Sequence, residues 1–413
     1  MKIKFKDFLV KLLFFFIFKS LILFYRYLLR TEIGLLKFQK DSEKSDYIEQ
    51  CNKLIDKYKN DPFLNSFLKE ISIISYDYTD KIKTSNNKVH IIINMNNKYI
   101  YPSLVTINSI LRNSIKNKTT IVCHILCPED LRRGNINKLK SLLFVYPTNL
   151  EMIFYNMGNL FNEYKRNRFS EVTFYRLLAP IFIPIEKVIY LDSDVLVFED
   201  LEEMYNLPFN NYYALGILDI LSNGLDYLGL ISEKYINAGV LLLNLDLIRK
   251  DHKYYELLSM YKYYKKLNNN DQTIINYVFY PKIGILPSKF GIFNFDSIFD
   301  IKYIYLKAIR TNLNITELIQ SFKHPALMHF VLCNPKAWNS HSLLIKKYTR
   351  AGTINKSSCK KYHDILFINI LILLFGLNML KILHFSKILS NIIKLETKAS
   401  IKSLFIILLS FKS

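Results

Sequence analysis

The stretch that most constrains the fold of this chain runs from Val188 to Val197, with the sequence Val-Ile-Tyr-Leu-Asp-Ser-Asp-Val-Leu-Val. Its first four residues are apolar and rich in β-branched and aromatic side chains, which predicts a buried strand. Two carboxylates, Asp192 and Asp194, follow directly. Ligands of open α/β sheets bind at the carboxyl ends of the strands, and paired carboxylate oxygens suit a hard cation such as Mg²⁺ or Mn²⁺. Taken alone, the motif is also a simple Asp-rich turn.

Strand-like and helix-like patterns alternate through the middle of the chain. Short apolar runs predict strands at 90–93, 121–126, 152–154, 188–191, 213–219, 236–244 and 326–330. Helical patterns fall between them, after Pro102, at 173–178, from Asp246 to about Lys266, and at 273–279 with residues 269–272 as its cap. Strands that alternate with helices indicate a mostly parallel sheet. We therefore predict the α/β class, with one large domain over residues 86–345.

The positive charge of the chain lies at its two ends. Of the formal net charge of +21, residues 1–40 carry +7 and residues 346–413 carry +10. Both ends are also rich in Leu, Ile and Phe, which favours an anionic membrane surface over a nucleic acid as the partner. A nucleic-acid-binding protein would more often carry its basic patch on a polar face of the folded domain. We therefore expect membrane association and no nucleic-acid partner.

The apolar runs at the two ends are short for a membrane span. The run at 8–29 is interrupted by basic residues that fall on one third of a helical wheel, as Lys4, Lys11, Lys19, Arg26 and Arg30. This pattern predicts a basic amphipathic helix in the membrane interface, with a true span and a core helix as alternatives. A secretory signal is disfavoured because no small-residue cleavage site follows. The run at 365–380 is borderline in length, and we expect it to lie on the membrane as well.

Residues 41–85 are polar and helix-prone, with a break at Pro62, and they predict a helical connector. The cysteines indicate neither a disulfide framework nor a zinc site, because their number is odd and they include no Cys-x-x-Cys pair. They are Cys51, Cys123, Cys127, Cys333 and Cys359. Reduced thiols in the cytoplasm fit this pattern best.

Four motifs follow one another between residues 88 and 340. They are Tyr-Leu-Asp-Ser-Asp-Val-Leu-Val at 190–197, Asn-Ala-Gly-Val-Leu-Leu-Leu-Asn at 237–244, Asp-Gln at 271–272, and His329 followed by Lys-Ala-Trp at 336–338. In this order the sequence resembles retaining glycosyltransferase family 8, which includes bacterial lipopolysaccharide galactosyl- and glucosyltransferases. The resemblance implies a GT-A fold, a nucleotide-sugar donor and a divalent metal, usually Mn²⁺.

The resemblance also assigns roles to single residues. Asp192 and Asp194 match the metal-binding pair, and His329 matches the third ligand, although a histidine at a strand end is more often structural when taken alone. A histidine among the ligands suits Mn²⁺ better than Mg²⁺, because imidazole is the softer donor. Asp271 and Gln272 match the pair beneath the reacting sugar, and Asp271 could instead be only a helix N-cap.

Further residues are expected to contact the donor. Lys336 matches the lysine that meets the diphosphate, and Arg176 matches an arginine that steadies the carboxylates; each has a simpler explanation as a solvated surface charge. The other expected donor-site residues are Asn96, Tyr99, Ser193, Asp219, Asn237 and Ala238.

Two stretches depart from the family pattern. The family has an Asp on uracil after the first strand, followed by Asn-Tyr, whereas this chain has Asn96 at the acidic position and Lys98 before Tyr99. An amide can still bond a base edge, so we expect a uridine-linked donor. The loop at 329–338 has lost a glycine, gained a residue and replaced a proline by Ala337, which implies a reshaped diphosphate loop.

We therefore expect a retaining hexosyltransferase that moves galactose or glucose from a UDP-sugar to a glycan or lipid-linked acceptor. Its expected place is the cytoplasmic face of the inner membrane, as a peripheral protein of lipopolysaccharide or surface polysaccharide synthesis. Two alternatives stay open: an inactive family member that serves as a membrane-bound adaptor, and a haloacid-dehalogenase-like phosphatase. Those phosphatases also end a strand with Asp-x-Asp, but they have Thr or Val where this chain has Leu196.

Overall fold

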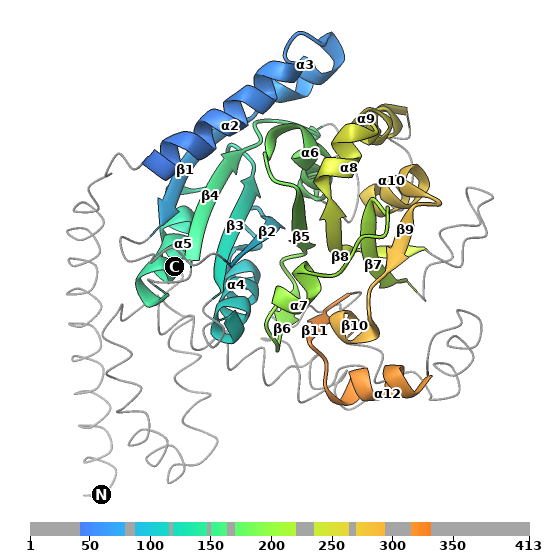
Figure 1. Ribbon diagram of the computed structural model, residues 1–413. Coiled ribbons are helices and arrows are strands. Elements are labelled where there is room, and N and C mark those ends of the chain that lie inside the picture. Colours follow the sequence, from blue (N-terminus) through green and yellow to red (C-terminus); the bar gives the residue numbers. More distant parts are fainter. Residues whose placement is uncertain are drawn as a thin grey trace, which may run out of the picture. The chain divides into compact units, whose positions relative to one another are not determined.

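An eight-stranded sheet forms the centre of the protein (Figure 1). The computed structural model describes residues 42–78, 87–114, 119–146, 150–162, 170–219, 235–263, 270–293 and 315–331. In spatial order the strands are β1 (Ser72–Tyr78), β4 (Leu150–Asn156), β3 (Thr120–Cys127), β2 (Lys88–Asn94), β5 (Lys187–Leu191), β8 (Ile236–Asn244), β7 (Ala214–Leu218) and β9 (Ile283–Ile285). The expected α/β class is therefore confirmed.

The sheet is parallel at its centre and mixed towards its edges. Strand β2 pairs in parallel with β3 and with β5, and β3 pairs in parallel with β4, as does β7 with β9. Strands β1 and β8 run antiparallel to their neighbours. Parallel strands are covered on both faces, which explains why their residues are almost continuously apolar; every residue of β3 is buried.

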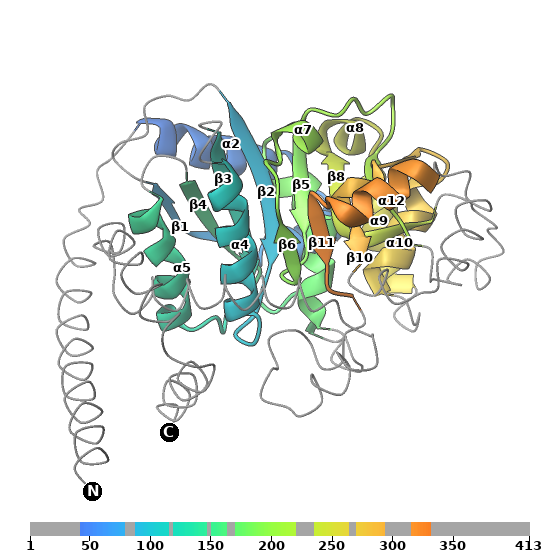
Figure 2. The same cartoon turned by 90° about the horizontal axis from the view of Figure 1, so that it is seen from below.

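Helices cover both faces of the sheet (Figure 2). The helices α4 (Ile100–Ser114) and α5 (Arg133–Val145) pack on β3 and β4, with α2 (Ser42–Tyr58) on the opposite side. The side of α2 also carries α3 (Pro62–Leu68), the 3₁₀ helix η2 (Glu171–Leu178), α6 (Ala179–Phe182), α8 (Leu245–Lys250), α9 (Lys253–Tyr263) and α10 (Asn270–Phe279). The largest hydrophobic cluster lies between these helices and the sheet.

A second, three-stranded sheet brings together segments that are far apart in the sequence. Its order is β10 (Ile292–Phe293), β11 (Leu327–His329) and β6 (Val195–Val197). Strand β11 pairs antiparallel with β6, with His329 opposite Val195. The remaining described elements are α7 (Glu202–Tyr205), η4 (Ser288–Phe290) and α12 (Ile315–Lys323). The chain thus passes from the large sheet to the small one through Asp192, Ser193 and Asp194.

Three details of the predicted elements were wrong. The expected helical connector over 41–85 also contains β1, which pairs with β4 at the edge of the large sheet. The long helix expected from Asp246 is interrupted between α8 and α9, where His252 has a φ of 53°. Helix α10 begins at Asn270, so Asp271 and Gln272 lie in its first turn rather than before it.

The described residues leave the expected membrane segments untested. Residues 1–40 and 346–413, with their predicted amphipathic helices, lie outside the described ranges. Among the helices that are described, none has the length and apolar character needed to cross a membrane. Cys51, Cys123 and Cys127, the cysteines in the described part, are buried free thiols.

Candidate functional site

Asp192, Asp194 and His329 converge at the junction of the two sheets. Both aspartates lie in the turn between β5 and β6, and the pairing of β11 with β6 brings the histidine to them. The backbone N–H of Phe330 donates to the Asp194 carbonyl over 2.9 Å, which fixes the two segments side by side. The Nε2 atom of His329 lies 3.1 Å from Asp194 Oδ1 and 3.6 Å from Asp192 Oδ2.

These three side chains fit a divalent cation. Their potential ligand atoms lie within 4.8 Å of one another. Neighbouring ligands of an octahedral ion stand about 3 Å apart when each metal–ligand bond is about 2.1 Å long. The distances of 3.1 and 3.6 Å from Nε2 of His329 to the two carboxylates are close to this value, and the mixture of imidazole and carboxylate suits Mn²⁺. Within the described part of the chain, this is the group of side chains that could hold a metal.

The charges at this group favour a bound cation. Burial lowers the pKa of His329, but the charge of Asp194 and the hydrogen bonds to both carboxylates outweigh burial and raise this pKa to about 9. Burial raises the pKa of Asp192, but Arg176 and His329 outweigh it, so that this pKa is well below its ordinary value. Two carboxylates thus attract positive charge to one point, and a metal ion would replace the imidazolium proton there.

Gly239 makes room for this group, and the sequence analysis did not single it out. A Cβ atom at this position would lie 2.1 Å from Cε1 of His329 and 2.7 Å from Oδ2 of Asp192. The Gly239 carbonyl also accepts from the backbone N–H of Asp192 over 2.8 Å. A glycine inside the otherwise apolar strand β8 was the available signal, because such a glycine often marks a close approach.

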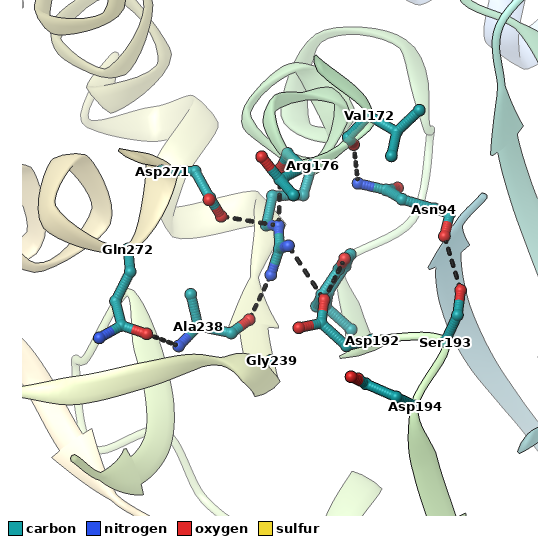
Figure 3. A network of polar contacts seen from close by, with 12 residues as sticks. Asn94, Val172, Arg176, Asp192, Ser193, Asp194, Ala238, Gly239, Asp271 and Gln272 are labelled. Carbon is teal, nitrogen blue, oxygen red and sulfur yellow. Dashed lines mark hydrogen bonds and ion pairs between the residues drawn. The ribbon is translucent and has the colours of Figure 1, made fainter. Parts of the chain in front are cut away.

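Arg176 links the metal-binding group to a second carboxylate (Figure 3). Arg176 is 3% exposed, and its guanidinium lies between Asp192 and Asp271. Nη2 lies 3.1 Å from Oδ1 of Asp192, and Nε lies 3.1 Å from Oδ2 of Asp271 as an ion pair without hydrogen-bond geometry. Nη1 donates to the Ala238 carbonyl. The expected role of Arg176 in steadying the carboxylates therefore agrees with its contacts.

The carboxyl group of Asp271 is unusually easy to protonate. Burial raises its pKa to about 6, although the nearby charge of Arg176 acts in the opposite direction. Asp271 is 5% exposed. One guanidinium is thus shared by two carboxylates.

Gln272 is held by hydrogen bonds on both sides of its amide. Its Oε1 accepts from the backbone N–H of Ala238 over 3.1 Å and from Nδ2 of Asn237 over 3.2 Å. Its Nε2 donates to Oδ2 of Asp219 over 2.8 Å. The structure therefore brings these four predicted residues together beside Arg176, at the carboxyl end of β7 and the start of β8 and α10.

Ser193 supports the turn rather than facing a ligand with its side chain. Its hydroxyl is 6% exposed, donates to the Asn94 carbonyl over 2.8 Å and accepts from Ser103 over 3.0 Å. Thr106 on α4 donates to the Ser193 carbonyl over 3.0 Å. The Ser193 hydroxyl therefore anchors the turn to β2 and α4, and the contact of Ser193 with the donor stays a prediction.

The residues expected near the nucleobase lie after β2. Oδ1 of Asn96 accepts from the backbone N–H of Lys98 over 3.0 Å, and its Nδ2 donates to the Ser170 hydroxyl over 3.2 Å. Tyr99 is half-buried at the start of α4, where its carbonyl accepts from the backbone N–H of Ser103 over 2.9 Å. Lys336 lies outside the described residues.

The glycosyl transferase family 8 model matches residues 90–342, which include every predicted site residue. This chain belongs to glycosyl transferase family 8. It is 29% identical over 208 residues to the lipopolysaccharide 1,2-glucosyltransferase of Escherichia coli, a match that covers 47% of this chain and 59% of that protein. It is 30% identical over 129 residues to a putative glycosyltransferase of Haemophilus influenzae, covering 30% of this chain and 39% of that one. Both matches span less than two-thirds of the relatives.

Solved structures support the family 8 fold. The bifunctional glycosyltransferase WbbM superposes with a TM-score of 0.53 at 21% identity, over 68% of this chain and 50% of WbbM. The galactosyltransferase LgtC, in complex with donor and acceptor sugar analogues, superposes with a TM-score of 0.51 at 22% identity, over 66% of this chain and 100% of LgtC. The chain is thus a family 8 glycosyltransferase with an α/β nucleotide-sugar transferase fold.

Proposed function

We propose that this protein is a retaining, metal-dependent hexosyltransferase that moves galactose or glucose from a UDP-sugar to a glycan or lipid-linked acceptor. The observation that carries the proposal is the convergence of Asp192 and Asp194, in the turn between β5 and β6, with His329 at the end of β11. Three ligand atoms within 4.8 Å of one another, and a glycine that makes room for them, support an active enzyme over the inactive adaptor.

The diphosphate side of the donor requires positive charge. The leaving group departs as an anion, and a divalent metal held by Asp192, Asp194 and His329 supplies the compensating charge when it is bound. The histidine favours Mn²⁺ over Mg²⁺. Lys336 is proposed to assist at the diphosphate, as the family resemblance implies.

The side chains proposed to lie beneath the donor sugar already form hydrogen bonds or ion pairs within the protein. The anomeric carbon develops oxocarbenium character, as in glycoside hydrolysis. Gln272 is a neutral amide whose Oε1 accepts two hydrogen bonds, and Asp271 forms an ion pair with Arg176. Both groups are therefore poor nucleophiles, which supports front-face attack, with the departing phosphate accepting the proton of the acceptor hydroxyl. A covalent glycosyl adduct trapped on Asp271 or Gln272 would refute this route.

Different observations support the proposed nucleobase of the donor and the proposed acceptor. The Asn96 amide can offer hydrogen bonds to uracil, in place of the family's usual carboxylate. The similarity to a lipopolysaccharide 1,2-glucosyltransferase and the basic, apolar ends of the sequence support an acceptor in lipopolysaccharide or surface polysaccharide synthesis. We propose a peripheral protein on the cytoplasmic face of the inner membrane, with the catalytic domain at 86–345. The basic ends would hold it there.

A phosphatase is a poor second candidate. A haloacid-dehalogenase-like enzyme needs the first aspartate as a free nucleophile. Here Oδ1 of Asp192 accepts from Arg176 at 3.1 Å, and Oδ2 faces His329 at 3.6 Å. The two oxygens thus face Arg176 and His329, which supports the role of a metal ligand over that of a nucleophile.

Donor hydrolysis tests the proposed function. The detergent-held protein should slowly release UDP from UDP-galactose or UDP-glucose with Mn²⁺, and Asp194→Ala should remove at least about 99% of this activity. Asp246→Ala is the matched control, because its side chain is 69% exposed on α8. Absence of turnover with any nucleotide sugar would favour the inactive adaptor, and full activity in Asp194→Ala would remove the metal site from the reaction.

A further inference from the structure

We infer that Tyr190 is a positioning residue whose hydroxyl, together with Arg176, holds one oxygen of Asp192 and leaves the other oxygen for the metal. The inference rests on the proposed metal-dependent function and assigns a role to a residue that touches neither the metal nor the donor. It also defines how Asp192 binds: through Oδ2 alone.

The two oxygens of Asp192 have different surroundings. Oδ1 accepts from the Tyr190 hydroxyl over 2.8 Å and from Nη2 of Arg176 over 3.1 Å. Oδ2 points to the other side, where it lies 3.6 Å from Nε2 of His329. A Cβ atom at position 239 would lie 2.7 Å from Oδ2, which places this oxygen against the backbone of β8. The carboxylate is therefore divided between a protein-facing and a metal-facing oxygen.

The position and contacts of Tyr190 stabilise this arrangement of Asp192. Tyr190 and Asp192 are two residues apart along β5 and its continuation, so their side chains leave the backbone on the same side. The phenol ring is 1% exposed, and Cζ of Arg176 lies 3.6 Å from the ring centroid. The ring thus supports the guanidinium while the hydroxyl reaches the carboxylate. A carboxylate oxygen only accepts hydrogen bonds, so the phenol is the donor.

The arrangement should influence which metal binds. Mg²⁺ demands octahedral geometry with short bonds, whereas Ca²⁺ accepts bidentate carboxylates in larger, more flexible shells. With Oδ1 held by two donors, Asp192 offers a single oxygen, which favours a small octahedral ion such as Mn²⁺. Without the Tyr190 hydroxyl, the carboxylate can rotate and offer both oxygens, so Mn²⁺ should lose affinity and Ca²⁺ should lose less or gain.

The test is Tyr190→Phe in the full chain, which keeps the ring over Arg176 and removes the hydroxyl. We expect the Kd of Mn²⁺, measured by calorimetry without donor, to rise about 10- to 100-fold, as for other partners that orient metal ligands. The ratio of the Ca²⁺ and Mn²⁺ affinities should shift towards Ca²⁺ by at least about fivefold. A general loss of packing would not change this ratio.

Tyr213→Phe is the matched control. The Tyr213 hydroxyl donates to Oδ2 of Asp251 over 2.6 Å, which is the same kind of contact at a position outside the site. Its removal should leave both metal affinities unchanged. Wild-type affinities and ratio in folded Tyr190→Phe would overturn the inference alone, whereas a wild-type protein that binds no Mn²⁺ would overturn the proposed function as well.

A wild-type measurement keeps the inference testable if Tyr190→Phe does not fold. A crystal structure of the wild-type protein with Mn²⁺ should show the metal on Oδ2 of Asp192 and the Tyr190 hydroxyl still on Oδ1. Chelation of the ion by both oxygens of Asp192, with the Tyr190 hydroxyl displaced, would refute the inference.

Discussion

Replacing Gly239 by alanine should damage metal binding more than folding. The new Cβ atom would lie 2.1 Å from Cε1 of His329, 2.8 Å from its Nδ1 and 2.7 Å from Oδ2 of Asp192. Ordinary van der Waals contact begins at 3.4 Å, so the imidazole must retreat by roughly 1.3 Å, the difference between 3.4 and 2.1 Å. The clash therefore falls on two of the three proposed metal ligands at once.

The size of the effect follows from the tolerance of metal sites. Ligand distances vary by only about 0.2 Å around their preferred values. A displacement several times larger separates the ligand from the ion, and we expect the Mn²⁺ affinity to fall at least about 100-fold, or about 2.7 kcal/mol. The change in stability should be smaller, because overpacking costs about 1–3 kcal/mol and the loss of a strand glycine returns about 0.5–1 kcal/mol.

Mn²⁺ calorimetry and thermal unfolding of the same preparations separate the two effects. Gly134→Ala on α5 is the matched control, because a Cβ atom there would meet nothing within 4 Å. It should bind Mn²⁺ as the wild-type protein does. A folded Gly239→Ala protein with wild-type Mn²⁺ affinity would show that the close approach of β8 to His329 and Asp192 is irrelevant to the metal site.

Three further predictions concern the network and the fold. Burial lowers the pKa of His90 to about 4 and that of His124 well below 6.5, so below pH 6.5 the unfolded chain binds more protons than the folded protein. The free energy of unfolding should therefore fall from pH 6.5 towards pH 4. Denaturant titrations should show a flatter slope for His90→Asn. Asp61 caps α3, so Asp61→Ala should lower the free energy of unfolding by about 1 kcal/mol in denaturant titrations, with activity per folded molecule unchanged. An unchanged denaturation midpoint would refute the role of the cap. Arg176→Lys keeps one charge but cannot serve both carboxylates, so kcat for donor hydrolysis should fall at least about tenfold, and an unchanged kcat would contradict the shared ion pair.

The strands of the large sheet could be predicted because each is a short apolar run. Strands β2, β3, β5 and β8 are buried on both faces, and continuous burial leaves a direct trace in the sequence. Strand β1 left no such trace: it lies at the edge of the sheet, and Tyr76 is the buried residue among those whose exposure is described. The break between α8 and α9 depends on backbone conformation at His252, which residue type does not specify.

The site was predictable in its members but not in its assembly. Asp192 and Asp194 follow a recognisable strand, whereas the approach of His329 depends on the pairing of β11 with β6. This pairing brings His329 to Asp194, which lies 135 positions away in the sequence. Only the family resemblance indicated that histidine. The anchoring role of Ser193, the space left by Gly239 and the contact of Tyr190 with Asp192 arise from tertiary packing, which local patterns do not encode.

The most direct measurement of the central claim is an equilibrium titration with Mn²⁺, followed by the electron paramagnetic resonance of the free ion. The wild-type protein should bind one Mn²⁺ per chain, and His329→Ala should bind it at least about 100-fold more weakly while its thermal unfolding stays cooperative. Undiminished binding by folded His329→Ala, or no binding by the wild-type protein, would contradict a metal site formed by Asp192, Asp194 and His329.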